Sequence, residues 1–167
     1  MLGKAISGGI ASARDGIARG LVRAGVGPNA LTAAGAVLTT GAGVCLALGA
    51  TSRPGWALEP LAEASAWPLL AGALLLLSFA CDMLDGAVAR VGGLKTDFGA
   101  FLDSTLDRCS DLAIYTGLIV HFAWTSPANV TFILLCLIAV ANAYLISYTR
   151  ARAEDLIDRC RVGYWQR

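Results

Sequence analysis

Acidic side chains interrupt two otherwise apolar stretches near the middle of the chain. Asp82 and Asp85 lie three residues apart in the first stretch, and Asp103 and Asp107 lie four apart in the second. Residues at these spacings share one face of a helix, so each pair projects from one side of its helix. Carboxylate oxygens suit Mg²⁺ or Mn²⁺, and two such ions balance four carboxylates. Two-metal sites promote in-line displacement at phosphorus, so the pattern predicts metal-assisted phosphoryl chemistry.

The positions of these acids along their helices place them at similar depths. An ionised carboxylate at the centre of a bilayer costs about 2.5–3.5 kcal/mol, so such groups normally face a cavity. At 1.5 Å per residue, Asp82 and Asp107 both lie about 12–15 Å from the loop that joins their helices. Asp111 extends the acidic face by one more turn and is expected to pair with Arg108, three residues before it. The two acidic faces are therefore expected to meet.

The composition assigns the chain to the membrane. Of its 167 residues, 56% are apolar and only 15% are charged, whereas about 25% of the residues in soluble domains are charged. The net charge of +1 gives no electrostatic support for binding nucleic acid. Five scattered cysteines without a CxxC spacing are expected to be reduced core thiols.

Four apolar stretches are each long enough to cross a bilayer, which needs about 20 residues per helix. The expected spans are residues 31–51, 67–88, 98–124 and 130–148. In residues 1–27, apolar side chains recur every three or four positions with basic ones opposite, which favours an amphipathic helix on the membrane surface. The alternative is a helix packed on protein. We therefore expect an all-α membrane bundle of four transmembrane helices with an N-terminal interfacial helix.

The basic residues predict the orientation of this bundle. Eleven Lys and Arg residues lie in the N-terminal segment, the second-to-third loop and the C-terminal segment, whereas the other two loops hold only Arg53. Because short cytoplasmic flanks are rich in Lys and Arg, both termini and the acidic site are expected to face the cytoplasm.

Residues 82–107 follow the pattern DxxDGxxAR-x8-GxxxDxxxD at every specified position. This stretch resembles the signature of the CDP-alcohol phosphotransferase family. The resemblance implies that a CDP-linked lipid, such as CDP-diacylglycerol, binds two divalent ions through its pyrophosphate. An alcohol then attacks the β-phosphorus and CMP leaves.

The resemblance also implies roles for individual residues. Asp82, Asp85 and Asp103 would be metal ligands, and Asp107 would be a ligand or neighbour of the second ion and the general base. A PNxxT sequence at residues 28–32 resembles the family's entry to the first span, although Asn29 could equally be a helix N-cap. The residues expected at the nucleotide are Asn29, Thr32, Asp82, Gly86, Ala89, Arg90 and Gly99.

Residues 147–154, with the sequence SYTRARAE, resemble the SYxKARAE segment of phosphatidylinositol-phosphate synthase-like members. This resemblance implies that Ser147 and Arg150 bind the acceptor, with Arg150 helping to hold its phosphate. Inositol phosphate is the first expectation and glycerol phosphate the second, while serine and inositol remain open. The alternative is a basic stop at a cytoplasmic helix end.

The whole chain, residues 1–167, is expected to form one membrane domain of this family. Family members usually have six spans, so we expect either a C-terminally truncated fragment or a short member. The resemblance also implies a homodimer among membrane lipids. Two alternatives are an aspartate-rich intramembrane prenyltransferase, which would have a different aspartate spacing, and a degenerate or non-catalytic membrane protein.

Overall fold

The computed structural model describes residues 2–49, 66–125 and 127–156, with only the backbone described for residues 2–10. These residues form helices and no strand, which confirms the expected all-α class. The helices are α1 (Leu2–Arg23), α2 (Pro28–Leu48), α3 (Trp67–Val91), α4 (Asp97–Trp124) and α5 (Val130–Glu154).

The boundaries of α2 and α3 follow from local backbone chemistry. Pro28 opens α2 three residues earlier than expected, because proline lacks an N–H and suits the first turn of a helix. The expected end of this span, Thr51, lies outside the described residues. α3 runs to Val91, beyond the expected Val88, and Gly93 follows with a φ of 63° that favours glycine.

Side-chain caps mark the starts of α4 and α5. The Thr96 hydroxyl accepts a hydrogen bond from the Gly99 N–H at 3.0 Å at the start of α4. The Asn129 amide oxygen accepts one from the Phe132 N–H at 3.2 Å at the start of α5. Such caps satisfy N–H groups that have no partner within the helix, so both helices begin close to their expected positions.

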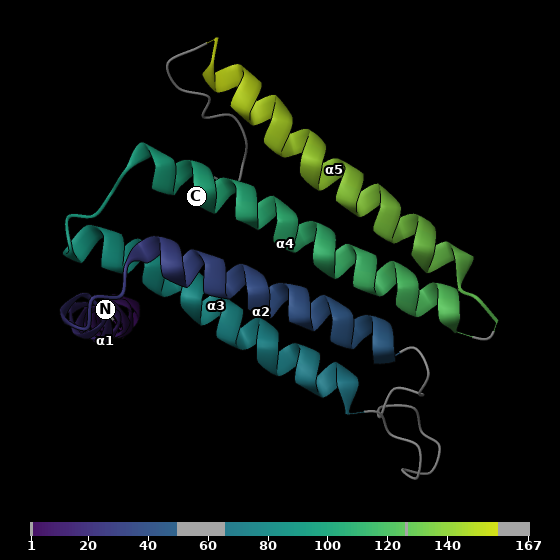
Figure 1. Ribbon diagram of the computed structural model, residues 1–167, viewed down its shortest axis with the longest axis horizontal. Coiled ribbons are helices and arrows are strands. Elements are labelled where there is room, and N and C mark those ends of the chain that lie inside the picture. The colour runs from purple at the N-terminus through teal and green to yellow at the C-terminus, as the bar shows by residue number, and fades with distance from the viewer. Residues whose placement is uncertain (1, 50–65, 126, 157–167) are drawn as a thin grey trace.

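Helices α2 to α5 run side by side, whereas α1 is seen end-on at one end of the bundle (Figure 1). α2 packs against both α3 and α4, and α5 packs against α4. α4 therefore lies between α2 and α5, and its first half faces the C-terminal half of α3.

The crossing of α2 and α4 depends on two glycines. A methyl group added to Gly43 would collide with the backbone carbonyl of Ala113, and one added to Gly117 would collide with the backbone of Gly43. Small residues let membrane helices approach until their backbones touch. This contact fixes the separation of α2 and α4 and so the geometry of the site between them.

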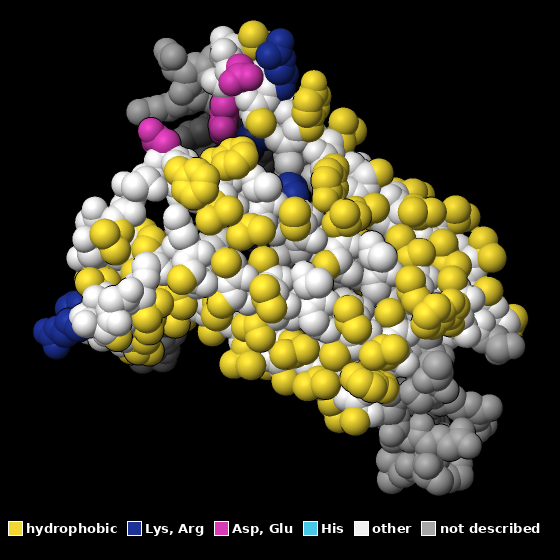
Figure 2. All heavy atoms as spheres, viewed as in Figure 1, with side chains coloured by type: hydrophobic (Ala, Val, Ile, Leu, Met, Phe, Trp, Pro, Cys, Tyr) yellow, Lys and Arg dark blue, Asp and Glu magenta, His cyan; other side chains and the backbone are white. Residues whose placement is uncertain are grey.

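Three of the helices, α2, α3 and α5, are long and apolar enough to cross a membrane. The 28-residue α4 is about 42 Å long, but charged side chains crowd its first half and it is not one of these three. Its place between α2 and α5 supports a fourth span, and that count stays a prediction. Figure 2 shows apolar side chains spread over the visible face, with the charged ones gathered at one end.

The C-terminal part of α1 packs on α3. Ala18 is buried against Ala87 and Val88, with Leu21 and Val22 alongside. Packing on protein was the alternative to an interfacial helix, and it accounts for part of the apolar face of α1. The crosswise direction of α1 still suits a helix lying in the membrane plane, and that placement stays a prediction.

Candidate active site

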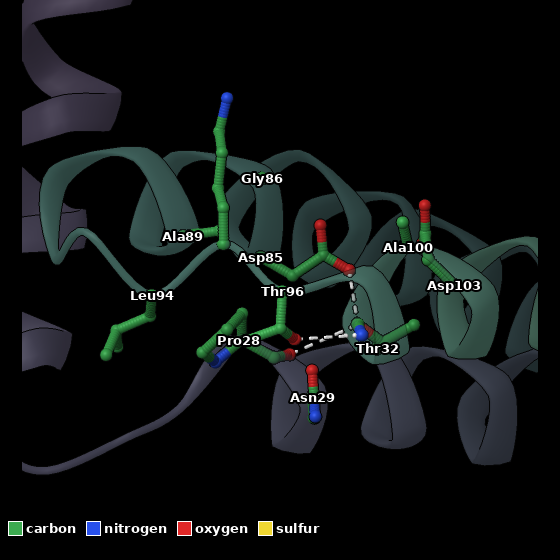
Figure 3. Close-up of a pocket in the computed structure, with 12 residues that line it drawn as sticks. Pro28, Asn29, Thr32, Asp85, Gly86, Ala89, Leu94, Thr96, Ala100 and Asp103 are labelled. Atoms are coloured by element: carbon green, nitrogen blue, oxygen red, sulfur yellow. Dashed lines mark hydrogen bonds between the residues drawn. The ribbon is translucent and has the colours of Figure 1, made fainter.

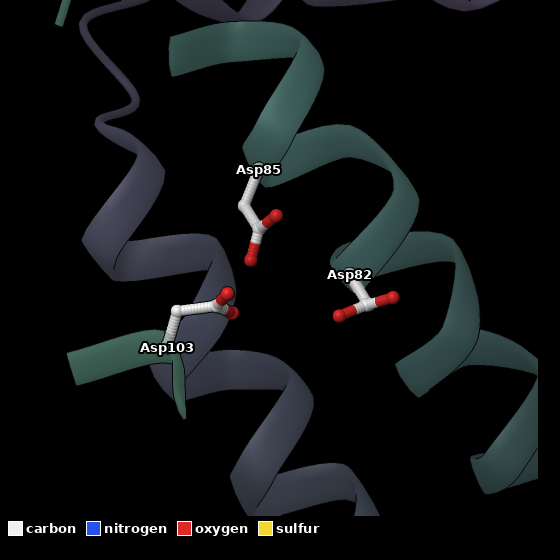
Figure 4. A group of neighbouring side chains, drawn as sticks. All are labelled: Asp82, Asp85 and Asp103. Carbon is white, nitrogen blue, oxygen red and sulfur yellow. The ribbon is translucent and has the colours of Figure 1, made fainter. Parts of the chain in front are cut away.

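Three carboxylates from two helices converge between α3 and α4. Oxygens of Asp82, Asp85 and Asp103 lie within 4.8 Å of one another. Figure 4 shows Asp82 and Asp85 on one helix directing their carboxylates toward that of Asp103. Asp85 is only 8% exposed, whereas Asp82 is open to solvent.

This group has the chemistry of a divalent cation site. Like charges at this separation repel one another, and burial of Asp85 removes part of the water that would screen them. A cation offsets both effects, and oxygen donors in this number suit Mg²⁺ or Mn²⁺. The three residues therefore fit the metal expected from the sequence.

The third wall of the site comes from α2. The Thr32 hydroxyl donates a hydrogen bond to Asp85 Oδ2 at 2.8 Å, and the Pro28 carbonyl lies 3.1 Å from the same hydroxyl (Figure 3). A hydroxyl directed at one carboxylate oxygen leaves the other free for a ligand. Thr32 thus orients Asp85.

A cavity of about 260 Å³ opens beside this hydrogen bond. Five of the seven residues expected at the nucleotide line it, together with Asp85 and Asp103. These five are Asn29, Thr32, Gly86, Ala89 and Gly99. Asp82 and Arg90 do not line this cavity. The Arg90 side chain is exposed, and its guanidinium would lie 3.6 Å from a methyl group added to Gly86.

The glycine at position 99 is needed for close approach. A methyl group there would lie 3.1 Å from Thr96 Oγ1 and 3.2 Å from Asn29 Oδ1. Both distances are tighter than ordinary contact, so any side chain would displace Asn29 or the cap of α4. Glycine therefore lets α2 and α4 close around the cavity.

A second cavity of about 340 Å³ adjoins the first and shares Thr32 and Asp85 with it. Asp107 lies here rather than in the group of three carboxylates. Other polar residues in its wall are Thr39, Ser78, Asp82, Arg108, Ser110 and Asp111. The predicted base therefore lines the same cavity as two of the predicted metal ligands, Asp82 and Asp85.

The expected pair between Arg108 and Asp111 is present, at 2.9 Å. The acceptor residues are placed differently from the metal ligands. Ser147 and Arg150 line neither cavity, and Arg150 pairs with Glu154 at 3.0 Å on exposed α5 surface. Their acceptor role stays a prediction.

Several lining residues were not expected from the sequence. Leu94, Lys95 and Thr96, in the loop between α3 and α4, complete the first cavity. In the second cavity, Thr39 and Ser78 are hydrogen bonded at 2.6 Å. In the sequence, a threonine and a serine inside apolar spans could have indicated Thr39 and Ser78. A capping residue beside a basic one could have indicated Thr96 and Lys95.

Comparison with known proteins identifies the family of this chain. The family model for CDP-alcohol phosphatidyltransferase matches residues 26–164. The phosphatidylinositol phosphate synthase of Mycobacterium tuberculosis is 40% identical over 152 residues, covering 90% of this chain and 62% of that protein. The archaetidylinositol phosphate synthase of Methanothermobacter thermautotrophicus is 45% identical over 95 residues, covering 57% of this chain and 45% of that protein.

Solved structures agree with the sequence comparison. The crystal structure of the M. tuberculosis enzyme with CDP-DAG bound matches with a TM-score of 0.72 and 32% identity, over 92% of this chain and 69% of that one. Its structure with manganese and citrate has the same score and identity, over 66% of that chain. The present chain spans less than two thirds of the length of the two synthases compared by sequence. The match over residues 26–164 and these relatives show that the chain belongs to the CDP-alcohol phosphatidyltransferase family.

Proposed function

We propose that this protein transfers a phosphatidyl group from a CDP-linked lipid, such as CDP-diacylglycerol, to an alcohol and releases CMP. Inositol phosphate is the first choice of acceptor and glycerol phosphate the second. One observation carries the proposal: three converging carboxylates adjoin a cavity lined by five of the residues expected at the nucleotide. Two relatives are named phosphatidylinositol phosphate synthase and archaetidylinositol phosphate synthase, and these names support the choice of acceptor.

The two cavities suggest how the substrates are arranged. The cytidine would occupy the first cavity, where Gly86 and Gly99 leave room near the backbone. Asp82, Asp85 and Asp103 would hold Mg²⁺ or Mn²⁺ against the pyrophosphate, and bound divalent ions supply charge neutralisation and polarisation of the phosphates. Thr32 keeps Asp85 aimed at this position.

Asp107 is the proposed general base. It lines the cavity next to the carboxylate group, where the acceptor hydroxyl would approach. The alcohol oxygen bonds to the β-phosphorus, the bond from that phosphorus to the CMP oxygen breaks, and the alcohol proton passes to Asp107. A base acting in this way must come within about 3 Å of the hydroxyl.

The setting of the reaction follows from the charge distribution. The excess of Lys and Arg in the N-terminal, second-to-third and C-terminal segments supports a cytoplasmic site in a multi-pass membrane protein. A homodimer is proposed from the family resemblance. Family membership favours phosphatidyl transfer over the prenyltransferase alternative.

A CMP-release assay tests the proposal. The full chain in detergent receives CDP-diacylglycerol with Mg²⁺ or Mn²⁺, and inositol phosphate, glycerol phosphate, serine and inositol are supplied separately. We expect metal-dependent CMP release with inositol phosphate. Release with another acceptor alone would correct the substrate, and no release with any acceptor would favour the non-catalytic alternative.

A further inference from the structure

Helix α5 is joined to α4 by a reciprocal pair of hydrogen bonds at Arg108. The Tyr144 hydroxyl donates to the Arg108 carbonyl at 2.9 Å. In return, the Arg108 guanidinium donates to the Ala143 carbonyl at 3.5 Å. We call this pair of contacts the Arg108–Tyr144 interlock.

The interlock is the polar component of an otherwise apolar contact. Among the described residues, these are the only hydrogen bonds between α4 and α5, and α4 is the main packing partner of α5. Asp111 pairs with the same guanidinium at 2.9 Å and so restrains its direction. Apolar contacts are not directional, whereas hydrogen bonds between named atoms favour one register.

The register fixed in this way has a consequence for the site. The two helices run in opposite directions (Figure 1), and each rises about 1.5 Å per residue. Arg150, six residues after Tyr144, therefore comes level with the turn of α4 that holds Asp103, about 9 Å from the interlock. Ser147, three residues after Tyr144, lies about 4.5 Å along α5 from the interlock, between the interlock and Arg150.

We propose that Arg108 and Tyr144 are positioning residues that hold Ser147 and Arg150 at the height of the carboxylate group, so that the acceptor phosphate is bound where its hydroxyl reaches the phosphorus. This inference rests on the proposed function. Neither residue touches a reacting atom in it. The pair of Arg150 with Glu154 is exposed to solvent, where such pairs contribute little to stability, so an acceptor phosphate can replace Glu154.

Tyr144→Phe removes one hydroxyl and keeps the ring. If α5 then samples several registers, only a fraction of molecules can bind acceptor, and the apparent affinity falls by that fraction. From measured interhelical hydrogen bonds we expect the KM for inositol phosphate to rise about 3- to 15-fold. The kcat at saturating acceptor and the KM for CDP-diacylglycerol stay unchanged, because α2 to α4 form the cavity for the CDP-lipid. Tyr115→Phe is the control, because the Tyr115 hydroxyl makes no hydrogen bond among the described residues.

A distance measurement tests the interlock without activity. Spin labels on exposed Cys109 of α4 and on Leu145→Cys of α5 report the relative position of the helices, with the other cysteines replaced by alanine. We expect Tyr144→Phe to broaden the distance distribution and Tyr115→Phe to leave it unchanged. An unchanged distribution with an unchanged acceptor KM would overturn the proposal, as would an equal rise in both KM values. If the unsubstituted chain releases no CMP, the proposed function fails, and the distance distribution alone decides the interlock.

Discussion

The hydrogen bond from Thr32 to Asp85 connects α2 to the carboxylate group and makes a sharp test of the site. Thr32→Val keeps the branched shape of the side chain and removes only the hydroxyl. A hydrogen bond to a charged group contributes about 1.5–3 kcal/mol. The Thr32 hydroxyl has one proton, and the Pro28 carbonyl at 3.1 Å competes for it with Asp85 Oδ2 at 2.8 Å. We therefore expect a loss at the lower end, about 1.5 kcal/mol.

This loss corresponds to about a tenfold weaker affinity for Mn²⁺. It agrees with the 10- to 100-fold effects that are typical when a partner of a metal ligand is removed. Direct Mn²⁺ titration of the protein in detergent, followed by the spin resonance of free Mn²⁺, measures the affinity. The Mn²⁺ dependence of CMP release provides a second reading.

Thr40→Val is the matched control on the same helix. Thr40 is exposed, and among the described residues its hydroxyl bonds only to the Ala36 carbonyl of α2 at 2.8 Å. We expect this variant to bind Mn²⁺ like the unsubstituted protein. If Thr32→Val leaves Mn²⁺ binding intact and raises only the KM for CDP-diacylglycerol, then Thr32 acts on the nucleotide and the reasoning about Asp85 is refuted.

Three further substitutions test other parts of the site. Asp107→Asn should lower kcat by at least about 100-fold, the usual minimum for a general base, while Mn²⁺ binding to the other three carboxylates persists; unchanged turnover would refute its role as base. Gly117→Ala should destabilise the protein by about 1–3 kcal/mol through overpacking against the α2 backbone, measured as a lower Tm. Gly72→Ala is its control, since a methyl group there meets nothing within 4 Å, and an equal fall in both variants would contradict this account. Gly99→Ala should raise the KM for CDP-diacylglycerol by displacing Asn29, and a KM equal to that of the unsubstituted protein would show that the contact is not needed.

The two adjoining cavities give these predictions separate readouts. Thr32 and Asp85 lie at their junction, so changes there affect metal and nucleotide. Asp107 lines only the second cavity, and Gly99 lines only the first. Effects on kcat, on the KM for the lipid and on metal affinity can therefore be assigned to different walls of the site.

Apolar runs and the spacing of the aspartates predicted the helices and the class of chemistry. Apolar runs of about 20 residues can form only helices in a bilayer, because every backbone polar group must be satisfied within the segment. The apolar runs also predicted the starts of three helices, so Trp67, Asp97 and Val130 begin their helices within one residue of expectation. Helical periodicity also placed Asp82 with Asp85 on one face, and the three-residue spacing predicted the pair of Arg108 with Asp111.

Which of these residues meet depends on how the helices pack against one another. Contact between Gly43 and Gly117 sets the separation of α2 and α4, and no periodicity within one helix encodes the distance to another. The tertiary arrangement brought Asp103, but not Asp107, into the group of three carboxylates, although the sequence places Asp107 at the depth of Asp82. Likewise, the two hydrogen bonds between α4 and α5 join Arg108 to Ala143 and Tyr144, about 35 positions later in the chain. Patterns along the sequence limit which faces of the helices can pack together, but they do not specify the contacts between helices.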